Sequence, residues 1–167
     1  MCADVVVADG GRAILPGAES VPDGPGEGPA AGILGAAARR PERALLVLAC
    51  DLPEVPAALL ERIVGEEGDW VVPRCGGHLE PLCALYRPRA LAALAARVRA
   101  GDLALHRLAG ARLRVRYLDA HDIADLGDPS RLFRNVNTRE DLARAARRPS
   151  PRDPPPVARR GSPSRRR

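Results

Sequence analysis

Residues 43–53 read RALLVLACDLP, an apolar run that ends in an aspartate, a leucine and a proline. The run has the length of a strand, and it shows no alternation of polar and apolar side chains beyond its first residue. That pattern predicts a strand buried on both faces of a parallel sheet covered by helices. The stretch therefore indicates an α/β fold, with Asp51 at the carboxyl end of an inner strand.

The sequence on either side of this strand alternates between strand and helix patterns. We expect strands at 4–8, 70–73, 81–86 and 113–118, helices at 33–40, 56–65 and 88–100, a Gly/Pro-rich loop at 22–32, and a short helix from Thr138 to about 147. Strand 113–118 alternates apolar and charged side chains, which favours an antiparallel or edge position.

The composition limits the classes of function. The chain has 167 residues and 46% hydrophobic residues, which is sufficient for one domain with a buried core. Aromatic residues make up only 2%, so the core must consist of Ala, Val and Leu. A nucleic-acid surface built on stacking aromatic side chains is therefore not expected.

The net charge of +5 comes from the end of the chain. Residues 149–167 contain six Arg and one Asp, a difference of five, so residues 1–148 are formally neutral. Six Pro and few apolar residues predict that this tail is disordered, because it cannot bury enough surface to offset its ordering entropy. We expect a domain at 1–148 and a tail at 149–167, which acts as a solvated extension or an anion-binding arm.

The cysteines indicate a cytoplasmic protein with reduced thiols. Four are present, without a C-x-x-C pair or a signal peptide. Cys75 and His78 could form half of a metal site, but no matching second pair follows. No apolar run reaches the length of about 18 residues needed to cross a membrane, so a membrane partner is not expected.

Asp51 is the first candidate for chemistry. Open α/β sheets bind ligands at the carboxyl ends of their strands, where a carboxylate suits Mg²⁺ bound to substrate phosphates. The same Asp-Leu-Pro sequence also suits the N-cap of the following helix. The local sequence is compatible with both interpretations.

Two further segments carry candidate binding residues. Gly26, Gly28 and Ala31 fit G-x-G-x-x-A at the start of a helix, a place that favours phosphate, although an ordinary surface loop is the alternative. Asn135 and Asn137 alternate, so both amides point to one face. They either bind substrate or cap the helix at Thr138.

Four segments occur together in an order that resembles the molybdenum cofactor guanylyltransferases. They are DGPGEGPAAGI at 23–33, LACDLP at 48–53, EPLCALYRP at 80–88 and FRNVNTREDL at 133–142. The resemblance implies a three-layer, Rossmann-like nucleotidyltransferase domain with a mostly parallel sheet. It also implies a Mg²⁺-dependent enzyme that transfers GMP from GTP to molybdenum-molybdopterin and releases pyrophosphate.

The resemblance also implies roles for particular residues. Asp51 would bind Mg²⁺ and act in catalysis, and Asp23, Gly28 and Asp51 would contact GTP. Asn135 and Asn137 would contact the pterin substrate or the nucleotide phosphates. Molybdoenzymes or cofactor-carrier proteins are the implied protein partners.

The sequence departs from that family at its beginning. The family starts with a strand and a loop of the type L-A-G-G-x-S-x-R-M-G followed by a Lys, and this chain has no such loop and no Lys. We therefore expect the first strand and its loop to be missing, and a chain starting at Met1 to bind GTP weakly and show no measurable transfer. The alternatives are a molybdenum cofactor cytidylyltransferase, another nucleotidyltransferase, or a non-catalytic binding remnant.

Overall fold

The computed structural model describes residues 4–138, 140–141 and 143. The chain divides into two units, Met1–Asn135 and Val136–Arg167. This division comes ahead of the boundary predicted at 148/149, and the predicted tail at 149–167 lies outside the described residues. The elements that follow all belong to the first unit.

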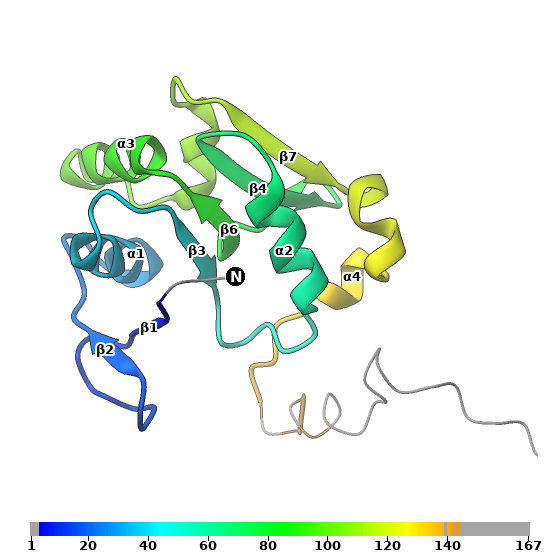
Figure 1. Ribbon diagram of the computed structural model, residues 1–167, viewed down its shortest axis with the longest axis horizontal. Coiled ribbons are helices and arrows are strands. Elements are labelled where there is room, and N and C mark those ends of the chain that lie inside the picture. The colour runs from blue at the N-terminus through cyan, green and yellow to red at the C-terminus, as the bar shows by residue number, and fades with distance from the viewer. Residues whose placement is uncertain (1–3, 139, 142, 144–167) are drawn as a thin grey trace, which may run out of the picture. The chain divides into compact units, whose positions relative to one another are not determined.

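Strands and helices alternate along the first unit (Figure 1). The strands are β1 (Val6–Ala8), β2 (Glu19–Val21), β3 (Leu45–Leu48), β4 (Trp70–Cys75), β5 (His78–Leu79), β6 (Cys83–Tyr86) and β7 (Val115–Asp119). The α-helices are α1 (Gly28–Arg39), α2 (Ala57–Gly65), α3 (Pro88–Arg99) and α4 (Pro129–Leu132), and the 3-10 helices are η1 (Leu105–Gly110) and η2 (Ala120–Leu126). The α/β class is confirmed.

The larger sheet has five strands. β6 lies between β3 and β4 and is antiparallel to both, β7 is parallel to β4, and β5 forms a hairpin with β4. Three of the five strands, β3, β4 and β7, therefore run in the same direction. β1 and β2 pair in parallel as a separate two-stranded sheet.

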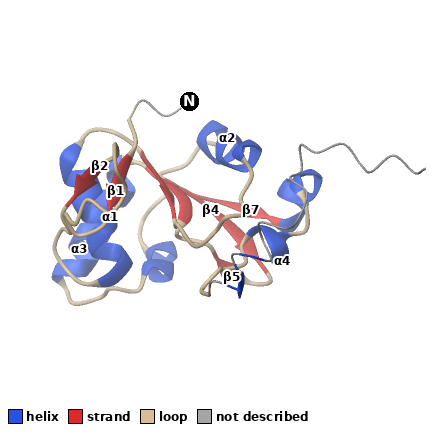
Figure 2. Ribbon diagram, turned by 90° about the horizontal axis from the view of Figure 1, so that it is seen from below, coloured by secondary structure: helices blue, strands red, loops and turns tan. Residues whose placement is uncertain are grey.

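Helices cover both faces of the larger sheet, which gives the three predicted layers (Figure 2). Side chains alternate along β4, so Trp70 and Val72 pack with α1, α3 and η1, whereas Val71 packs with α2, η2 and α4. The same alternation divides β6 between the two hydrophobic clusters. Because both faces are apolar, the central strands β4 and β6 are almost fully buried.

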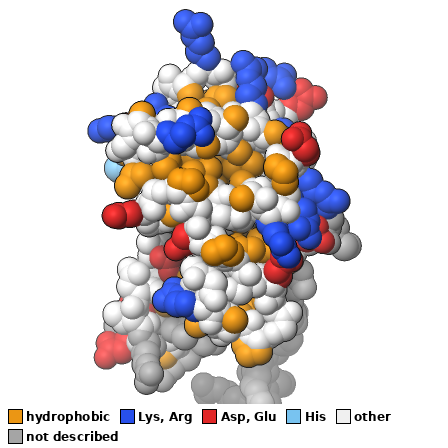
Figure 3. Space-filling model, turned by 90° about the vertical axis from the view of Figure 1, so that its left-hand side faces the viewer, with side chains coloured by type: hydrophobic (Ala, Val, Ile, Leu, Met, Phe, Trp, Pro, Cys, Tyr) orange, Lys and Arg blue, Asp and Glu red, His pale blue; other side chains and the backbone are white. Residues whose placement is uncertain are grey.

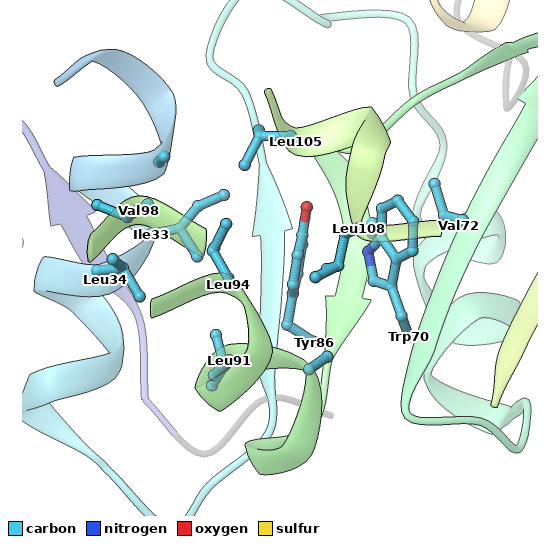
Figure 4. Close-up of a cluster of buried hydrophobic side chains, with 13 residues drawn as sticks. Ile33, Leu34, Trp70, Val72, Tyr86, Leu91, Leu94, Val98, Leu105 and Leu108 are labelled. Carbon is cyan, nitrogen blue, oxygen red and sulfur yellow. The ribbon is translucent and has the colours of Figure 1, made fainter. Parts of the chain in front are cut away.

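An aromatic pair stands at the centre of the first cluster (Figure 4). The ring centroids of Trp70 and Tyr86 lie 5.8 Å apart at an interplanar angle of 43°. The Tyr86 hydroxyl donates a hydrogen bond of 2.8 Å to the carbonyl oxygen of Pro81. The remaining side chains of the cluster are aliphatic, as the composition predicts.

Helices α1 and α3 contact one another and cover one face of the sheet (Figure 1). Each begins with a proline in its first turn, where the missing N–H is not needed. α3 ends before Gly101, which has a left-handed φ of 80° and stops the helix as predicted. Figure 3 views this side of the molecule, where hydrophobic side chains form a band with charged side chains at its borders.

One detail of the predicted strands is wrong. β3 is half-buried rather than buried on both faces, and Leu48 is 44% exposed, because within the described residues β3 pairs only with β6. The predicted antiparallel or edge position of strand 113–118 is confirmed as an edge position, because within the described residues β7 pairs only with β4, in parallel. The short strands β2 and β5 were not expected, since each has too few residues for a recognisable pattern.

The helix boundaries also differ from the sequence expectation. α1 begins at Gly28 instead of 33, so the Gly/Pro-rich segment supplies the first turn of the helix and not only a loop. In the second unit, the Asp141 N–H donates a hydrogen bond of 3.0 Å to Thr138 Oγ1, as the predicted cap requires. The predicted continuation of that helix beyond 143 lies outside the described residues.

Candidate functional site

Acidic residues follow the ends of three strands: Asp9 follows β1, Asp23 follows β2, and Asp51 follows β3. Two contacts place the beginnings of β1 and β3 near one another, because the Asp4 carboxylate lies 3.2 Å from Arg43 Nη1 and 3.3 Å from Arg40 Nε. Helix α1 contacts β1, β2 and β3, so it packs against both the two-stranded sheet and the larger sheet.

Helix α1 runs back along β1 and β2. Its last residue, Arg39, forms an ion pair with Glu19 at the start of β2. Near its first turns, a Cβ atom added to Gly32 would lie 3.3 Å from the Cβ of Ala8 at the end of β1. The N-terminus of α1 thus lies at the carboxyl ends of β1 and β2, the position that favours anionic ligands in α/β proteins.

The segment that carries Asp23 is attached to α1 through backbone atoms. The Gly24 N–H donates a hydrogen bond of 2.8 Å to the carbonyl oxygen of Ala31. A Cβ atom on Gly35 would lie 2.0 Å from the carbonyl oxygen of Pro22, so only glycine allows this approach. The position of Asp23 is therefore determined by the backbone on both sides of it.

The carboxylate of Asp23 is exposed and lies between two glycines. A Cβ atom on Gly10 would be 3.4 Å from Oδ2, and one on Gly32 would be 3.8 Å from Oδ1. Because neither glycine carries a side chain, the carboxylate remains accessible to a ligand.

Gly28 is the first residue of α1 and has a left-handed φ of 62°. A Cβ atom there would meet nothing within 4 Å, so the space in front of the helix is open. The N-cap residue, Glu27, makes no capping hydrogen bond through its side chain. The lack of a side-chain cap and the open space at Gly28 are compatible with the predicted contact to the nucleotide.

Asp51 lies in a turn at the carboxyl end of β3. The Ala49 N–H donates to the carbonyl oxygen of Leu82 at 2.8 Å, the Leu52 N–H donates to Ala49 at 3.4 Å, and Leu52 is buried in the second cluster. Asp51 is half-buried, and within the described residues its side chain makes no hydrogen bond or ion pair. The N-cap of α2 is Pro56, so the interpretation of Asp51 as a helix cap is wrong.

Asn135 is connected to the loop that follows Asp51. Arg134, its neighbour in the chain, forms an ion pair with Glu54 in that loop. Asn135 is exposed, as is Asn137, which belongs to the second unit. Neither amide makes a hydrogen bond within the described residues, and the cap of the following turn is Thr138 itself. Their interpretation as helix caps is therefore not supported, and their contact with substrate stays a prediction.

Sequence reasoning did not find Asp9, which is 4% exposed. Its carboxylate accepts hydrogen bonds from the Gly11, Arg12 and Ile14 N–H groups at 3.1, 3.1 and 2.9 Å, and from the Ser20 hydroxyl. The local signal for Asp9 is the Asp-Gly-Gly sequence that follows a strand. That sequence by itself predicts only a turn. Burial of the carboxylate depends on Ser20, which lies 11 residues further along the chain.

Glu80 precedes the EPLCALY strand, where the sequence alone favours a surface loop residue over a contact with substrate. It lies between β5 and β6, where Cys83, its neighbour in β6, pairs with Leu48 of β3, so it is close to the same edge of the sheet as Asp51. Partial burial raises the pKa of Glu80 above its usual value, although His78 opposes the shift. A carboxyl group with a raised pKa at a ligand-binding edge is a candidate for substrate contact.

The environment of Asp9 predicts a pH dependence of stability. Hydrogen bonds from the Ser20 hydroxyl and three backbone N–H groups lower its pKa from the usual 3.8, although burial opposes the shift. A lowered folded pKa gives stability that is present above about pH 4 and lost as the pH falls through the folded pKa. Asp9→Asn should therefore reduce the free energy of unfolding at neutral pH, and the difference from wild type should shrink below about pH 4. Urea denaturation across this range tests it, and a difference independent of pH would contradict it.

The described residues contain no group of three or more His, Cys, Asp or Glu side chains that could hold a metal ion. Cys75 and His78 are partners across the β4–β5 hairpin, without further ligands among the described residues. Cys50, Cys75 and Cys83 are free thiols, and burial raises the pKa of Cys75 to about 11 and that of Cys83 to about 12.

Comparison with known proteins identifies a matching family model and several similar proteins. Residues 1–117 match the family model of the MobA-like NTP transferase domain. The chain is 34% identical over 122 residues to the probable molybdenum cofactor guanylyltransferase of Pelotomaculum thermopropionicum, covering 72% of this chain and 59% of that protein. It is 30% identical over 102 residues to the molybdenum cofactor guanylyltransferase of Desulfosudis oleivorans, covering 59% of this chain and 50% of that protein.

A solved structure agrees with these relatives. Molybdopterin-guanine dinucleotide biosynthesis protein A from Archaeoglobus fulgidus superimposes with a TM-score of 0.63 at 29% identity, covering 77% of this chain and 66% of that one. The chain thus spans between half and two thirds of the length of these relatives. The α/β fold, the order of the motifs and the matched residues lead to one conclusion: this chain belongs to the family of MobA-like NTP transferase domains.

Proposed function

We propose that this chain acts in the transfer of GMP from GTP to molybdenum-molybdopterin, forming the guanine dinucleotide form of the cofactor and pyrophosphate. Membership of the MobA-like family supports a nucleotidyltransferase, and the names of its relatives support the guanylyl reaction. One observation carries the proposal: Asp51 is a half-buried carboxylate without a protein partner among the described residues, at the strand end where α/β sheets bind nucleotides.

The reaction requires positioning and charge neutralisation more than a protein nucleophile. An oxygen of the terminal phosphate of molybdopterin attacks the α-phosphorus of GTP, and the bond between the α-phosphorus and the oxygen that bridges to the β-phosphate breaks. Asp23 would orient the nucleotide, and the first turn of α1 at Gly28 would direct N–H groups at its phosphates. Asn135 and Asn137 would hold the pterin substrate through their amides.

A divalent ion fits the residues that are present. Mg²⁺ commonly binds one or two carboxylates and completes its coordination with water and substrate phosphates. Asp51 offers one such carboxylate, and its lack of a cation partner within the described residues leaves it available. When bound there, Mg²⁺ would stabilise the negative charge that develops on the phosphates.

Nucleotide selectivity tests the proposal against the sister reaction, cytidylyl transfer. In a version extended by the first strand and glycine-rich loop of the family, we expect GTP to compete for binding and turnover more effectively than CTP, with Mg²⁺ present in both cases. Turnover of molybdenum-molybdopterin with CTP at an equal or higher rate would overturn the guanylyl assignment. A micromolar dissociation constant for GTP would in addition contradict the expectation that residues 1–167 bind it weakly.

The exposed thiol of Cys50 provides a test that does not depend on turnover. Cys50 is exposed and directly precedes Asp51, whereas Cys83 is buried with a pKa raised to about 12. We expect iodoacetamide to alkylate Cys50 rapidly and Cys83 slowly, because only the thiolate of an accessible cysteine reacts. GTP with Mg²⁺ should slow the reaction at Cys50 and leave Cys83 unchanged, as peptide mass spectrometry would show. Equal labelling of Cys50 with and without nucleotide would argue against binding at this turn.

No helix among the described residues is long and apolar enough to cross a membrane. We propose a cytoplasmic location and contact with molybdoenzymes or cofactor-carrier proteins, on the resemblance stated above. Both proposals rest on the sequence and on that resemblance.

A further inference from the structure

The turn after β1 is built around the buried carboxylate of Asp9. Oδ1 accepts from the N–H groups of Gly11 and Arg12 and from the Ser20 hydroxyl, and Oδ2 accepts from the Ile14 N–H. The hydroxyl also accepts from the Ala13 N–H at 3.2 Å. These bonds hold a backbone with left-handed φ angles at Gly10, Gly11 and Ala13.

This turn packs directly on the segment that carries Asp23. The Gly11 N–H also donates to the carbonyl oxygen of Val21 at 3.1 Å, and a Cβ atom on Gly11 would lie 3.9 Å from Pro22. A Cβ atom on Gly10 would lie 3.4 Å from Asp23 Oδ2. A displacement of the turn would therefore displace the Asp23 carboxylate directly, because no side chain lies between them.

The other side of the segment is held rigidly. Gly24 is hydrogen-bonded to α1, and the close approach of Gly35 to Pro22 leaves no space for displacement in that direction. Asp23 is thus enclosed by a helix on one side and by the turn on the other. The conformation of the turn depends on Asp9, which is buried and does not face a ligand itself.

We propose that Asp9 is a positioning residue for Asp23: by fixing the Gly10–Gly11 turn, it determines where the exposed Asp23 carboxylate meets the nucleotide. The inference rests on the proposed function of Asp23 in GTP binding. Asp9 acts only through the backbone of the turn, so its contribution to binding requires the Asp23 carboxylate.

The substitution Asp9→Asn tests this inference. The amide has one acceptor oxygen and an NH₂ group, so it cannot accept from both sets of donors, and at least one N–H loses its partner. In NMR spectra of the chain without nucleotide, the backbone amide signals of Asp23 and Gly24 should shift. GTP binding in the presence of Mg²⁺, followed by NMR titration, should weaken by about tenfold, as expected when the hydrogen bond between the displaced Asp23 carboxylate and the nucleotide is lost.

A double-mutant cycle distinguishes positioning from a general structural role. In the Asp23→Asn background, Asp9→Asn should no longer change GTP affinity, although it should lower the melting temperature in both backgrounds. Ser20→Ala keeps the Asp9 carboxylate and removes one of its donors together with the acceptor of the Ala13 N–H, and it should shift the same signals if Asp9→Asn does not fold. Asp128→Asn is the matched control, because Asp128 also accepts from an N–H and a hydroxyl, both of Ser130, at the start of α4; it should leave the Asp23 signal and GTP affinity unchanged.

The possible outcomes separate this inference from the proposed function. Unchanged Asp23 and Gly24 signals in both Asp9→Asn and Ser20→Ala would overturn the positioning role. An equal loss of affinity with and without the Asp23 carboxylate would overturn it as well. If the signals shift but Asp23→Asn alone leaves GTP binding unaffected, positioning stands and the assignment of Asp23 to the nucleotide fails.

Discussion

In a version of the protein extended by the first strand and glycine-rich loop of the family, replacing Asp51 with asparagine should lower the rate of GMP transfer by about a hundredfold or more, which is the usual effect of losing one electrostatic contact to a transition state. The amide keeps the shape of the side chain and removes the charge that would hold Mg²⁺. The melting temperature should remain close to that of the wild type, because within the described residues the carboxylate makes no hydrogen bond or ion pair that the substitution could break.

Two measurements test the substitution. Transfer is followed with GTP labelled at its α-phosphate, and metal binding is followed by the broadening that Mn²⁺, in place of Mg²⁺, causes in the amide signals near Asp51. Asp125→Asn is the control, because it makes the same change in net charge. Asp125 lies on η2 and forms an ion pair with Arg62 of α2. Normal transfer by Asp51→Asn at saturating Mg²⁺, together with unchanged Mn²⁺ broadening, would show that the metal assignment is wrong.

Replacing Gly35 with alanine should destabilise the fold by about 3 kcal/mol and lower the melting temperature by roughly 10 °C. The added Cβ would lie 2.0 Å from the carbonyl oxygen of Pro22 and 2.9 Å from the nitrogen of Gly24, and both obstacles are backbone atoms that cannot rotate away. The gain in helix propensity, about 1 kcal/mol, is too small to compensate. Because Pro22 must move, Asp23 moves with it, and GTP binding should weaken.

Gly65→Ala is the matched control for this helix glycine. Gly65 is the last residue of α2, and a Cβ atom there would meet nothing within 4 Å. Alanine should therefore be neutral or stabilising by up to about 1 kcal/mol. Thermal melts and urea denaturation of both variants test the comparison. A Gly35→Ala protein as stable as the wild type would mean that α1 does not approach the Asp23 segment through its backbone.

The sequence predicted the part of the candidate site that depends on local pattern. The apolar run at 43–50 located a strand, and the Asp-Leu-Pro that follows located Asp51 at its carboxyl end. The order of the motifs indicated the family. The local sequence could not exclude a helix cap for Asp51, because the position of the cap depends on where α2 begins.

Several features of the site could not be derived from local pattern. The short strand β2 contains only three residues, and its pairing with β1 positions the segment that carries Asp23. Gly35 looked like an ordinary residue of an Ala-rich helix, although it is the point of closest approach to Pro22. Asp9 looked like a turn residue, although Ser20 completes its hydrogen bonds.

The sequence by itself determined the α/β class, the approximate positions of the main strands and helices, and the acid that follows β3, because side-chain periodicity and turn residues act over a few neighbouring positions. Only the tertiary structure decided that β3 is half-buried, that α1 begins at Gly28, and that Asp9 lies beneath the turn next to Asp23. These features depend on contacts between segments distant in sequence, where backbone approach and buried hydrogen bonds select among conformations that the local sequence permits equally.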